Sequence, residues 1–257
     1  MSLYCLVSWD VAEPWQMSFQ DGATKFMFKI HTIHDEGMFY LVLIFTFVSW
    51  FSFQSLYKFN RKRHLISHFG LVQGRLVEFW WTTFPILILI LIAVPAFKLL
   101  YLTDEVPKSE VKVEIVGRQW FWQYEVEDLV PVSAHDCGVQ KINFDGIMLT
   151  SGDFTSGRWR LLETENILVL PNFVNVQVSV TSADVIHCWT VPSLGIKVDA
   201  IPGRFNTLVF QLNREGLFYG QCSEICGANH SFMPISVLSK DYQTYLWWFS
   251  GLAGREF

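Results

Sequence analysis

The sequence predicts a membrane-anchored α+β protein, in which a hairpin of two membrane-spanning helices precedes a β-rich domain in water. Two stretches without a charged residue, 37–57 and 79–97, carry the first half of this prediction. A helix of about 20 residues reaches roughly 30 Å, the thickness of the hydrocarbon core of a bilayer. The second half depends on short alternating strands after residue 103 and on a cluster of sulfur and imidazole side chains within 220–235. Helices buried in a soluble core are the alternative for the apolar stretches.

Residues 1–37 are predicted to form an N-terminal segment on the same side of the membrane as the β domain. Within it, 23–33 is predicted to be a short amphipathic helix that lies in the membrane interface. The first ten residues have no basic region like that of a secretory signal. We expect them to be retained, and cleavage of a brief leader before Asp10 or Ala12 is the alternative.

The transmembrane hairpin is predicted over 38–102, with helices near 38–57 and 79–101 and a connecting loop at 58–78. This loop carries five lysine or arginine side chains and one acid. Short basic loops remain on the side from which a membrane protein is inserted. The loop therefore faces a bacterial cytoplasm or a mitochondrial matrix, and both termini lie on the opposite face. Glu78, at the inner edge of the second helix, is either a carboxylate among lipid headgroups or a functional acid.

The segment 103–257 is predicted to fold as a sandwich or barrel of short strands separated by turns. Residues 111–116 alternate apolar and polar side chains with period two, as a half-buried strand does. If the strand pattern continues, Trp120, Trp122 and Tyr124 share one face. The strand region precedes a predicted short aromatic helix near the C-terminus.

The charge of this domain differs from that of the rest of the chain. It carries 18 acidic and 11 basic side chains, a net charge of −7, whereas the whole chain has −5. An acidic surface favours association with a basic protein partner, and ordinary solubility is the alternative explanation. We predict no nucleic-acid partner.

The stretch 220–235 carries two thiols, an imidazole and a thioether within twelve positions, namely Cys222, Cys226, His230 and Met233. Thiolate, thioether and imidazole ligands together favour copper over calcium, magnesium or manganese. The second imidazole is expected from upstream, with His187 as the best candidate. A disulfide between the two cysteines is the alternative, although it would not need the neighbouring histidine and methionine.

Two thiolates on one loop can bridge two metal ions, whereas a blue-copper site uses a single thiolate. His187 and His230 would then each complete one copper. Met233 and a main-chain carbonyl, that of Glu224, would occupy the weak axial positions. Because no coordination position stays open, such a centre is suited to electron transfer and not to oxygen chemistry.

Several further motifs accompany this loop: 14–21, 78–105, Gly117-Arg-Gln-Trp-Phe-Trp122, 160–163, 184–195 and 199–204. Together they resemble cytochrome c oxidase subunit II, of the mitochondrial type, over most of the chain. The resemblance implies a two-helix transmembrane hairpin followed by a cupredoxin-like Greek-key β-barrel. It also implies a dinuclear copper A centre with the ligands His187, Cys222, Glu224 (by its carbonyl), Cys226, His230 and Met233. A magnesium ion is implied at the interface with subunit I, held in part by the Glu224 carboxylate.

The same resemblance implies that the chain is the electron-accepting subunit of a proton-pumping oxidase. Electrons from cytochrome c would arrive at Trp120 and pass through the copper centre to a haem in subunit I, where oxygen is reduced. Glu125, Glu165 and Asp184 match the acidic residues that dock cytochrome c. Glu78 matches the glutamate at the mouth of a proton pathway into subunit I.

The implied location is the mitochondrial inner membrane, where the chain crosses the bilayer twice and both termini face the intermembrane space. Its neighbours there would be subunit I and other oxidase subunits. A quinol oxidase subunit would lack the copper ligands, so the remaining alternatives are a membrane-anchored copper-binding carrier and another copper A electron-transfer protein. Three positions depart from the family pattern: Arg118, Phe121 and Cys188 replace the usual histidine, tyrosine and serine. None of them removes a ligand.

Overall fold

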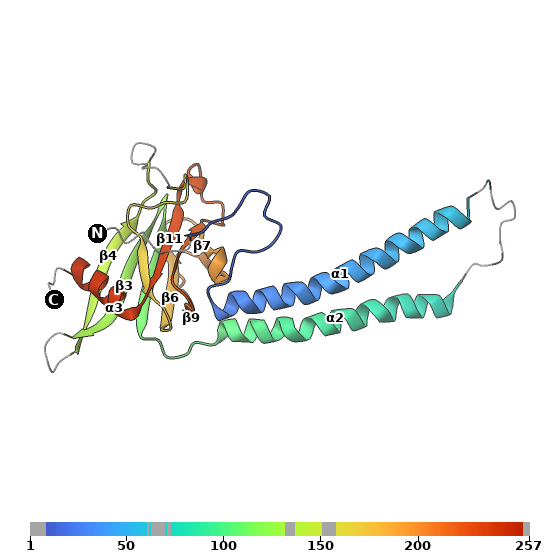
Figure 1. The fold of residues 1–257 in the computed structure, drawn as a ribbon, viewed down its shortest axis with the longest axis horizontal. Helices are drawn as coiled ribbons and strands as arrows, with labels where there is room; N and C mark the ends of the chain where they lie inside the picture. Colours follow the sequence, from blue (N-terminus) through green and yellow to red (C-terminus); the bar gives the residue numbers. More distant parts are fainter. Residues whose placement is uncertain are drawn as a thin grey trace. The chain divides into compact units, whose positions relative to one another are not determined.

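The computed structural model describes residues 9–60, 62, 70, 73–131, 137–150 and 158–253. The chain divides into two compact units (Figure 1). A helical unit contains 29–102, and a β unit combines the residues up to 28 with those from 103 onward. These compact units divide after residue 28, and the N-terminal segment 1–37 stays a prediction.

The helical unit is built from α1 (Lys25–Lys58) and α2 (Arg75–Asp104), the two long coiled ribbons of Figure 1. Both helices are long and apolar enough to cross a membrane, and no residue of their most apolar windows is buried in the protein. Pro85 and Pro95 lie inside α2. An exposed apolar surface of this extent has to be covered by lipid or by partner helices.

The first helix is longer than predicted. The amphipathic helix expected at 23–33 and the span expected at 38–57 are parts of one continuous helix of 34 residues. At 1.5 Å per residue this helix is about 51 Å long. The only strong helix-breaking residue near the expected boundary is Gly37, and one glycine costs a helix only about 1 kcal/mol.

The residues before and at the start of α1, up to Phe28, belong to the β unit and are packed within it. Ala23, Thr24 and Met27 are buried. The Thr24 hydroxyl donates a hydrogen bond of 2.5 Å to the carbonyl of Leu194, and the Ala23 N–H donates one of 2.9 Å to the carbonyl of Ser193. The N-terminal segment is thus part of the β unit.

The described residues of the β unit form three sheets, with the strand orders β1-β10-β11-β5, β4-β3-β2-β6-β9 and β7-β8. Parallel and antiparallel pairs are mixed, since β2 pairs with β6 in parallel and with β3 antiparallel. The elements are β1 (Trp9–Asp10), β2 (Val111–Arg118), β3 (Phe121–Pro131), β4 (Cys137–Gly146), β5 (Leu168–Pro171), β6 (Asn175–Ser182), β7 (His187–Val191), η1 (Pro192–Leu194), β8 (Ile196–Ala200), β9 (Asn206–Gln211), β10 (Gly216–Gln221), η2 (His230–Phe232), β11 (Pro234–Lys240) and α3 (Tyr242–Leu252).

Alternation along β2 and β3 builds the core. Val113 and Ile115 of β2 point inward and are buried, as are Trp122 and Tyr124 of β3. Trp120, however, does not continue this face, because β2 ends at Arg118 and β3 begins at Phe121. The prediction that the three aromatic residues share one strand face is therefore wrong for Trp120, which lies in the turn between the two strands.

Arg214 ties the N-terminal segment to the β unit. Its Nη1 and Nη2 each lie 2.8 Å from a carboxylate oxygen of Asp10. Nη2 also donates to the carbonyl of Asp21 at 2.9 Å, and Nε donates to that of Gly22 at 3.3 Å. The guanidinium group stands 5.0 Å from the ring centre of Phe218.

We expect Arg214→Ala to loosen this segment, because the Asp10 side chain, only 10% exposed, would lose its charged partner. The free energy of opening of residues 10–24 should fall by about 2 kcal/mol. Amide hydrogen exchange measures this value directly. Lys112→Ala removes an exposed ion pair with Glu127 at 3.5 Å and is the control, with an expected change below about 0.5 kcal/mol. Equal protection in both variants would contradict the prediction.

The C-terminal helix α3 begins with a cap whose charge gives it a pH dependence. The Asp241 carboxylate accepts hydrogen bonds from the Thr244 hydroxyl at 2.5 Å and the Thr244 N–H at 3.0 Å. These bonds lower the pKa of Asp241 below its ordinary value of 3.8. A carboxylate with a lowered pKa stabilises the fold above its ordinary pKa, and this contribution is lost as the pH falls through the lowered value.

Protection of the first turn of α3 against hydrogen exchange should therefore weaken below a pH of 3.8. Asp241→Ala should remove this pH dependence and cost up to about 1 kcal/mol at neutral pH, because the cap is lost. Asp241→Asn keeps a capping side chain that does not titrate. In this variant, protection of the first turn of α3 should therefore not change over this pH range. A cap-dependent pH effect that persists in Asp241→Asn would exclude Asp241 as its source.

Candidate metal centre

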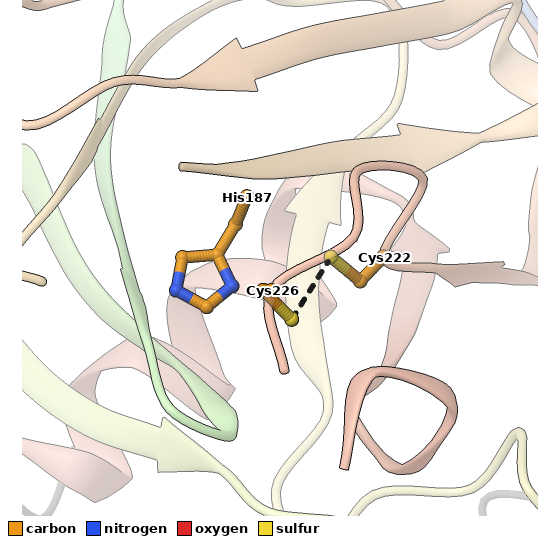
Figure 2. A group of neighbouring side chains, drawn as sticks. All are labelled: His187, Cys222 and Cys226. Carbon is orange, nitrogen blue, oxygen red and sulfur yellow. Dashed lines mark hydrogen bonds between the residues drawn. The ribbon is translucent and has the colours of Figure 1, made fainter. Parts of the chain in front are cut away.

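Three predicted ligands meet inside the β unit. His187 is the first residue of β7, and Cys222 and Cys226 lie on the loop that follows β10. All three side chains are buried, and their ligand atoms lie within 4.8 Å of one another. Figure 2 shows the imidazole directed toward the two sulfur atoms, which are 4.0 Å apart. The structure thus brings together one upstream histidine and both thiols.

The other predicted ligands surround the same thiols. Nδ1 of His230 lies 3.5 Å from Sγ of Cys226, and Sδ of Met233 lies 3.5 Å from the same sulfur. The carbonyl oxygen of Glu224 lies 3.3 Å from Sγ of Cys222. Its side chain is exposed, so the main chain of Glu224 faces inward while its carboxylate is accessible. Two thiols, two imidazoles, a thioether and a carbonyl form a donor set that suits copper.

Two glycines allow the elements that carry these ligands to pack closely together. A Cβ atom on Gly117 would lie 2.9 Å from Cδ2 of His187. A Cβ atom on Gly220 would lie 2.0 Å from the carbonyl oxygen of Thr190. The first glycine lets the imidazole lie directly on β2, and the second lets β10 approach β7. Trp122 also packs edge-on against His187, with ring centres 5.9 Å apart.

Asp184 orients the imidazole of His187. One carboxylate oxygen of Asp184 lies 2.8 Å from Nε2 of His187. On the other ring nitrogen, Nδ1 is buried and has no hydrogen-bond partner among the residues that the structure describes. A histidine that binds a metal commonly directs its second nitrogen to a carboxylate in this way. Nδ1 is therefore the nitrogen available to a metal ion.

The electrostatics of this pair follow from its surroundings. Burial lowers the pKa of His187, but the Cys222 thiol and the Asp184 carboxylate outweigh burial, so the pKa lies above its ordinary value. Burial raises the pKa of Asp184, but the His187 imidazole and the N–H groups of Gln119 and Val185 bring it below its ordinary value. The imidazole and the carboxylate thus stabilise each other's charged form.

The two thiols titrate as a pair. Burial raises the pKa of Cys222, but His187 and nearby N–H groups outweigh it and lower the pKa. Burial and the neighbouring Cys222 raise the pKa of Cys226. Metal ligation requires both thiols to lose their protons. The positive charge of a bound cation would stabilise the second thiolate beside the first. By contrast, burial raises the pKa of Cys188 to about 11, and this thiol stays protonated.

Trp120 and Glu78 occupy different units. The indole of Trp120 lies against Gly227 on the loop that carries the cysteines, where a Cβ atom would approach Nε1 to 3.2 Å. Glu78 lies in the first turn of α2, beside an open hollow lined by Arg75, Phe79, Thr82 and Thr83. Its carboxylate accepts a hydrogen bond of 3.4 Å from the Gly74 N–H.

The predicted docking acids are not equivalent. Glu125 is 2.5 Å from Nζ of Lys141 on the neighbouring strand, so a lysine that also lies 3.4 Å from Glu127 already offsets part of its charge. Asp184 is engaged by His187, whereas Glu165 is exposed. Nε of Arg118 donates a hydrogen bond of 2.9 Å to Gln123, which holds the guanidinium group beside the turn of Trp120.

Sequence reasoning missed one residue of the site, Gln119. Its side-chain amide donates a hydrogen bond of 2.8 Å to the carbonyl of Cys226. Its main-chain N–H donates another, of 2.7 Å, to Asp184. Its only sequence signal is its place beside Trp120, because neither partner is close to it along the chain.

Comparison with known proteins identifies relatives for both units. The family model of the cytochrome C oxidase subunit II periplasmic domain matches residues 111–240, and that of the transmembrane domain matches 12–99. Cytochrome c oxidase subunit 2 of Cyanidium caldarium is 44% identical, over 93% of this chain and 91% of that protein. The Schizosaccharomyces pombe protein of the same name is 45% identical, over 93% and 94%. A solved structure is also similar: the crystal structure of the periplasmic domain of subunit II of cytochrome oxidase of Bradyrhizobium japonicum. Its sequence is 36% identical, the TM-score is 0.48, and the match covers 58% of this chain and 98% of that chain.

Proposed function

The chain belongs to the cytochrome c oxidase subunit II family, and we propose that its β unit holds the dinuclear copper A centre and accepts electrons from cytochrome c. Its fold class is the predicted one, two spanning helices followed by a cupredoxin-like domain. As a member of this family, it is a subunit of a haem-copper terminal oxidase. The copper nuclearity, the electron donor and the role of each residue are the proposal.

The buried group of His187, Cys222 and Cys226 is the observation that carries this proposal. Two thiols 4.0 Å apart, with the imidazoles of His187 and His230 close to them, suit a pair of bridged metal ions better than a single ion. We assign Met233 and the carbonyl of Glu224 as the weaker ligands that would complete the site. A bound copper pair would supply one-electron transfer there.

The surrounding residues hold and shield this centre. Asp184 fixes the imidazole of His187 with Nδ1 facing the thiols. Met233 and both cysteines are buried, which keeps water from the metal. A site already shaped before the electron arrives needs little reorganisation, and fast transfer depends on that property.

Trp120 is the proposed point of electron uptake. Its position in the turn before β3, against Gly227 of the copper loop (residues 222–233), supports this role. Cytochrome c would dock over this turn, with the net negative charge of the domain steering a basic partner. Because Lys141 balances Glu125, we expect Glu165 to contribute more to steering than Glu125 does.

Electrons would leave toward a haem in subunit I, where oxygen is reduced and protons are pumped. The exposed carboxylate of Glu224 would hold a magnesium ion at that interface. Glu78, in the first turn of α2, would stand at the mouth of a proton pathway on the other side of the membrane. The proposed location is the mitochondrial inner membrane, with both termini in the intermembrane space.

Metal analysis and paramagnetic resonance of the intact oxidase test the proposal. We expect two copper ions per chain in addition to the copper of the oxygen-reducing site, and a mixed-valence spectrum with seven hyperfine lines. A four-line spectrum from one copper per chain would indicate a blue-copper site. Absence of bound copper, in an oxidase that still accepts electrons from a quinol, would overturn the proposal.

A further inference from the structure

Gln119 connects the turn of Trp120 to two parts of the metal site. Its side-chain Nε2 donates a hydrogen bond of 2.8 Å to the carbonyl oxygen of Cys226. Its main-chain N–H donates a hydrogen bond of 2.7 Å to the carboxylate of Asp184, which in turn lies 2.8 Å from His187. One residue next to Trp120 is therefore bonded to a thiol ligand's own backbone and, through Asp184, to an imidazole ligand.

Gly227 shows how closely this turn approaches the loop. A Cβ atom at Gly227 would lie 3.1 Å from Cζ2 of Trp120 and 3.2 Å from Nε2 of Gln119. The backbone of Gly227, with φ of +129°, adopts a conformation that favours glycine. The indole and the amide thus rest together on the residue that follows Cys226.

The indole itself contributes no bond that would fix its place. Nε1 of Trp120 is buried and has no hydrogen-bond partner in the part of the chain that the structure describes. Van der Waals contacts alone define position less sharply than a directed hydrogen bond does. The pairing of Arg118 with Phe121 closes the turn, and the amide of Gln119 adds a directed hydrogen bond between the turn and the loop.

We propose that Gln119 is a positioning residue for electron uptake, which sets the contact between Trp120 and the copper loop through its hydrogen bond to the carbonyl of Cys226. This inference rests on the proposed function. In the step concerned, the reduced haem of cytochrome c loses one electron and the oxidised metal centre gains it, without any bond forming or breaking. Gln119 acts on the geometry of this transfer and does not carry the electron.

Gln119→Met tests this role, because methionine keeps the length of the side chain and removes the amide donor. The main-chain bond to Asp184 remains. Gln119→Glu is the stronger variant, since it places a carboxylate oxygen against the carbonyl of Cys226. Gln177→Met is the matched control: Gln177 lies on β6 and accepts a hydrogen bond of 3.1 Å from Ser109, away from the loop.

The measurement is rapid reduction of the metal centre by photoreduced cytochrome c, in the whole oxidase, with the association rate and the transfer rate within the complex resolved separately. We expect Gln119→Met to slow transfer within the complex about three- to tenfold, because the population of the bonded geometry, from which transfer is fastest, should fall by the factor that one lost hydrogen bond corresponds to. Gln119→Glu should slow it further. Association, copper content and the absorption of the centre should stay unchanged in Gln119→Met, and Gln177→Met should match the unmodified protein throughout.

Three outcomes would overturn the inference. If Gln119→Met slows only association, Gln119 is a docking contact and not a positioning residue. If Trp120→Leu slows transfer but Gln119→Met does not, electron uptake at Trp120 is supported and the proposed role of Gln119 is wrong. Unchanged transfer in Trp120→Leu would instead remove the proposed uptake point, and with it the inference.

Discussion

Cys222→Ser is expected to leave the assembled chain without its proposed copper pair. Cys222 and Cys226 provide the thiolates that bridge two metal ions in the proposed centre, and a serine hydroxyl does not replace a soft thiolate ligand for copper. Substituting partners in the shell beyond a metal's ligands already lowers metal affinity about 10- to 100-fold. Loss of a bridging ligand should exceed that range and abolish the mixed-valence spectrum.

Cys188→Ser provides the matched control for this prediction. Cys188 is next to His187 and is also buried, but its Sγ lies 3.4 Å from the Thr190 hydroxyl and its pKa is raised by burial. A serine can make the same contact, so copper content and spectrum should remain unchanged. Copper analysis and paramagnetic resonance of both variants decide the question. If Cys188→Ser loses copper and Cys222→Ser keeps it, the ligand assignment is wrong.

The sequence was informative wherever a pattern is local. Two charge-free stretches predict the membrane helices, because the thickness of a bilayer sets a length that few soluble helices share. Strand alternation predicts β2 and its buried face. The copper loop is recognisable because its thiols, imidazole and thioether lie within twelve positions. In each case, the residues that give the signal are close together in the chain.

Apart from the approach of His187 to the two thiols, contacts between distant residues were the part that sequence reasoning did not supply. The bond of Arg214 to Asp10 joins residues 204 positions apart, and it brings the N-terminal segment into the β unit. The pairing of Lys141 with Glu125 depends on the register between β3 and β4, which composition does not reveal. Trp120 was assigned to a strand face because the alternation of Trp120, Trp122 and Tyr124 in the sequence begins within the turn between β2 and β3.

The role of Gln119 was missed for a related reason. Its partners, Asp184 and the carbonyl of Cys226, are 65 and 107 positions away. One of them is a main-chain atom, and a backbone carbonyl leaves no trace in the identity of its residue. Functional geometry built from backbone atoms therefore emerges only once the fold is known.

Gly220→Ala is expected to prevent the β unit from folding and, as a consequence, to abolish copper binding. The added Cβ would lie 2.0 Å from the carbonyl oxygen of Thr190, 3.0 Å from its carbonyl carbon and 3.1 Å from Val191. Two of these atoms belong to the main chain of β7, so no side-chain rotation relieves the overlap. Separating β10 from β7 would move Cys222 away from His187. The cost should exceed about 4 kcal/mol, the range of severe core substitutions.

Gly251→Ala is the control with the opposite expected sign. Gly251 lies in α3 and a Cβ atom there would meet no atom within 4 Å. Alanine is favoured over glycine in a helix by up to about 1 kcal/mol, so this variant should be as stable as the unmodified chain or more stable. Thermal unfolding, copper content and assembly with the other oxidase subunits distinguish the two variants. A Gly220→Ala chain that keeps its copper and its unfolding temperature would mean that β7 and β10 are not packed as closely as the structure has them, and that the position of His187 does not depend on this contact.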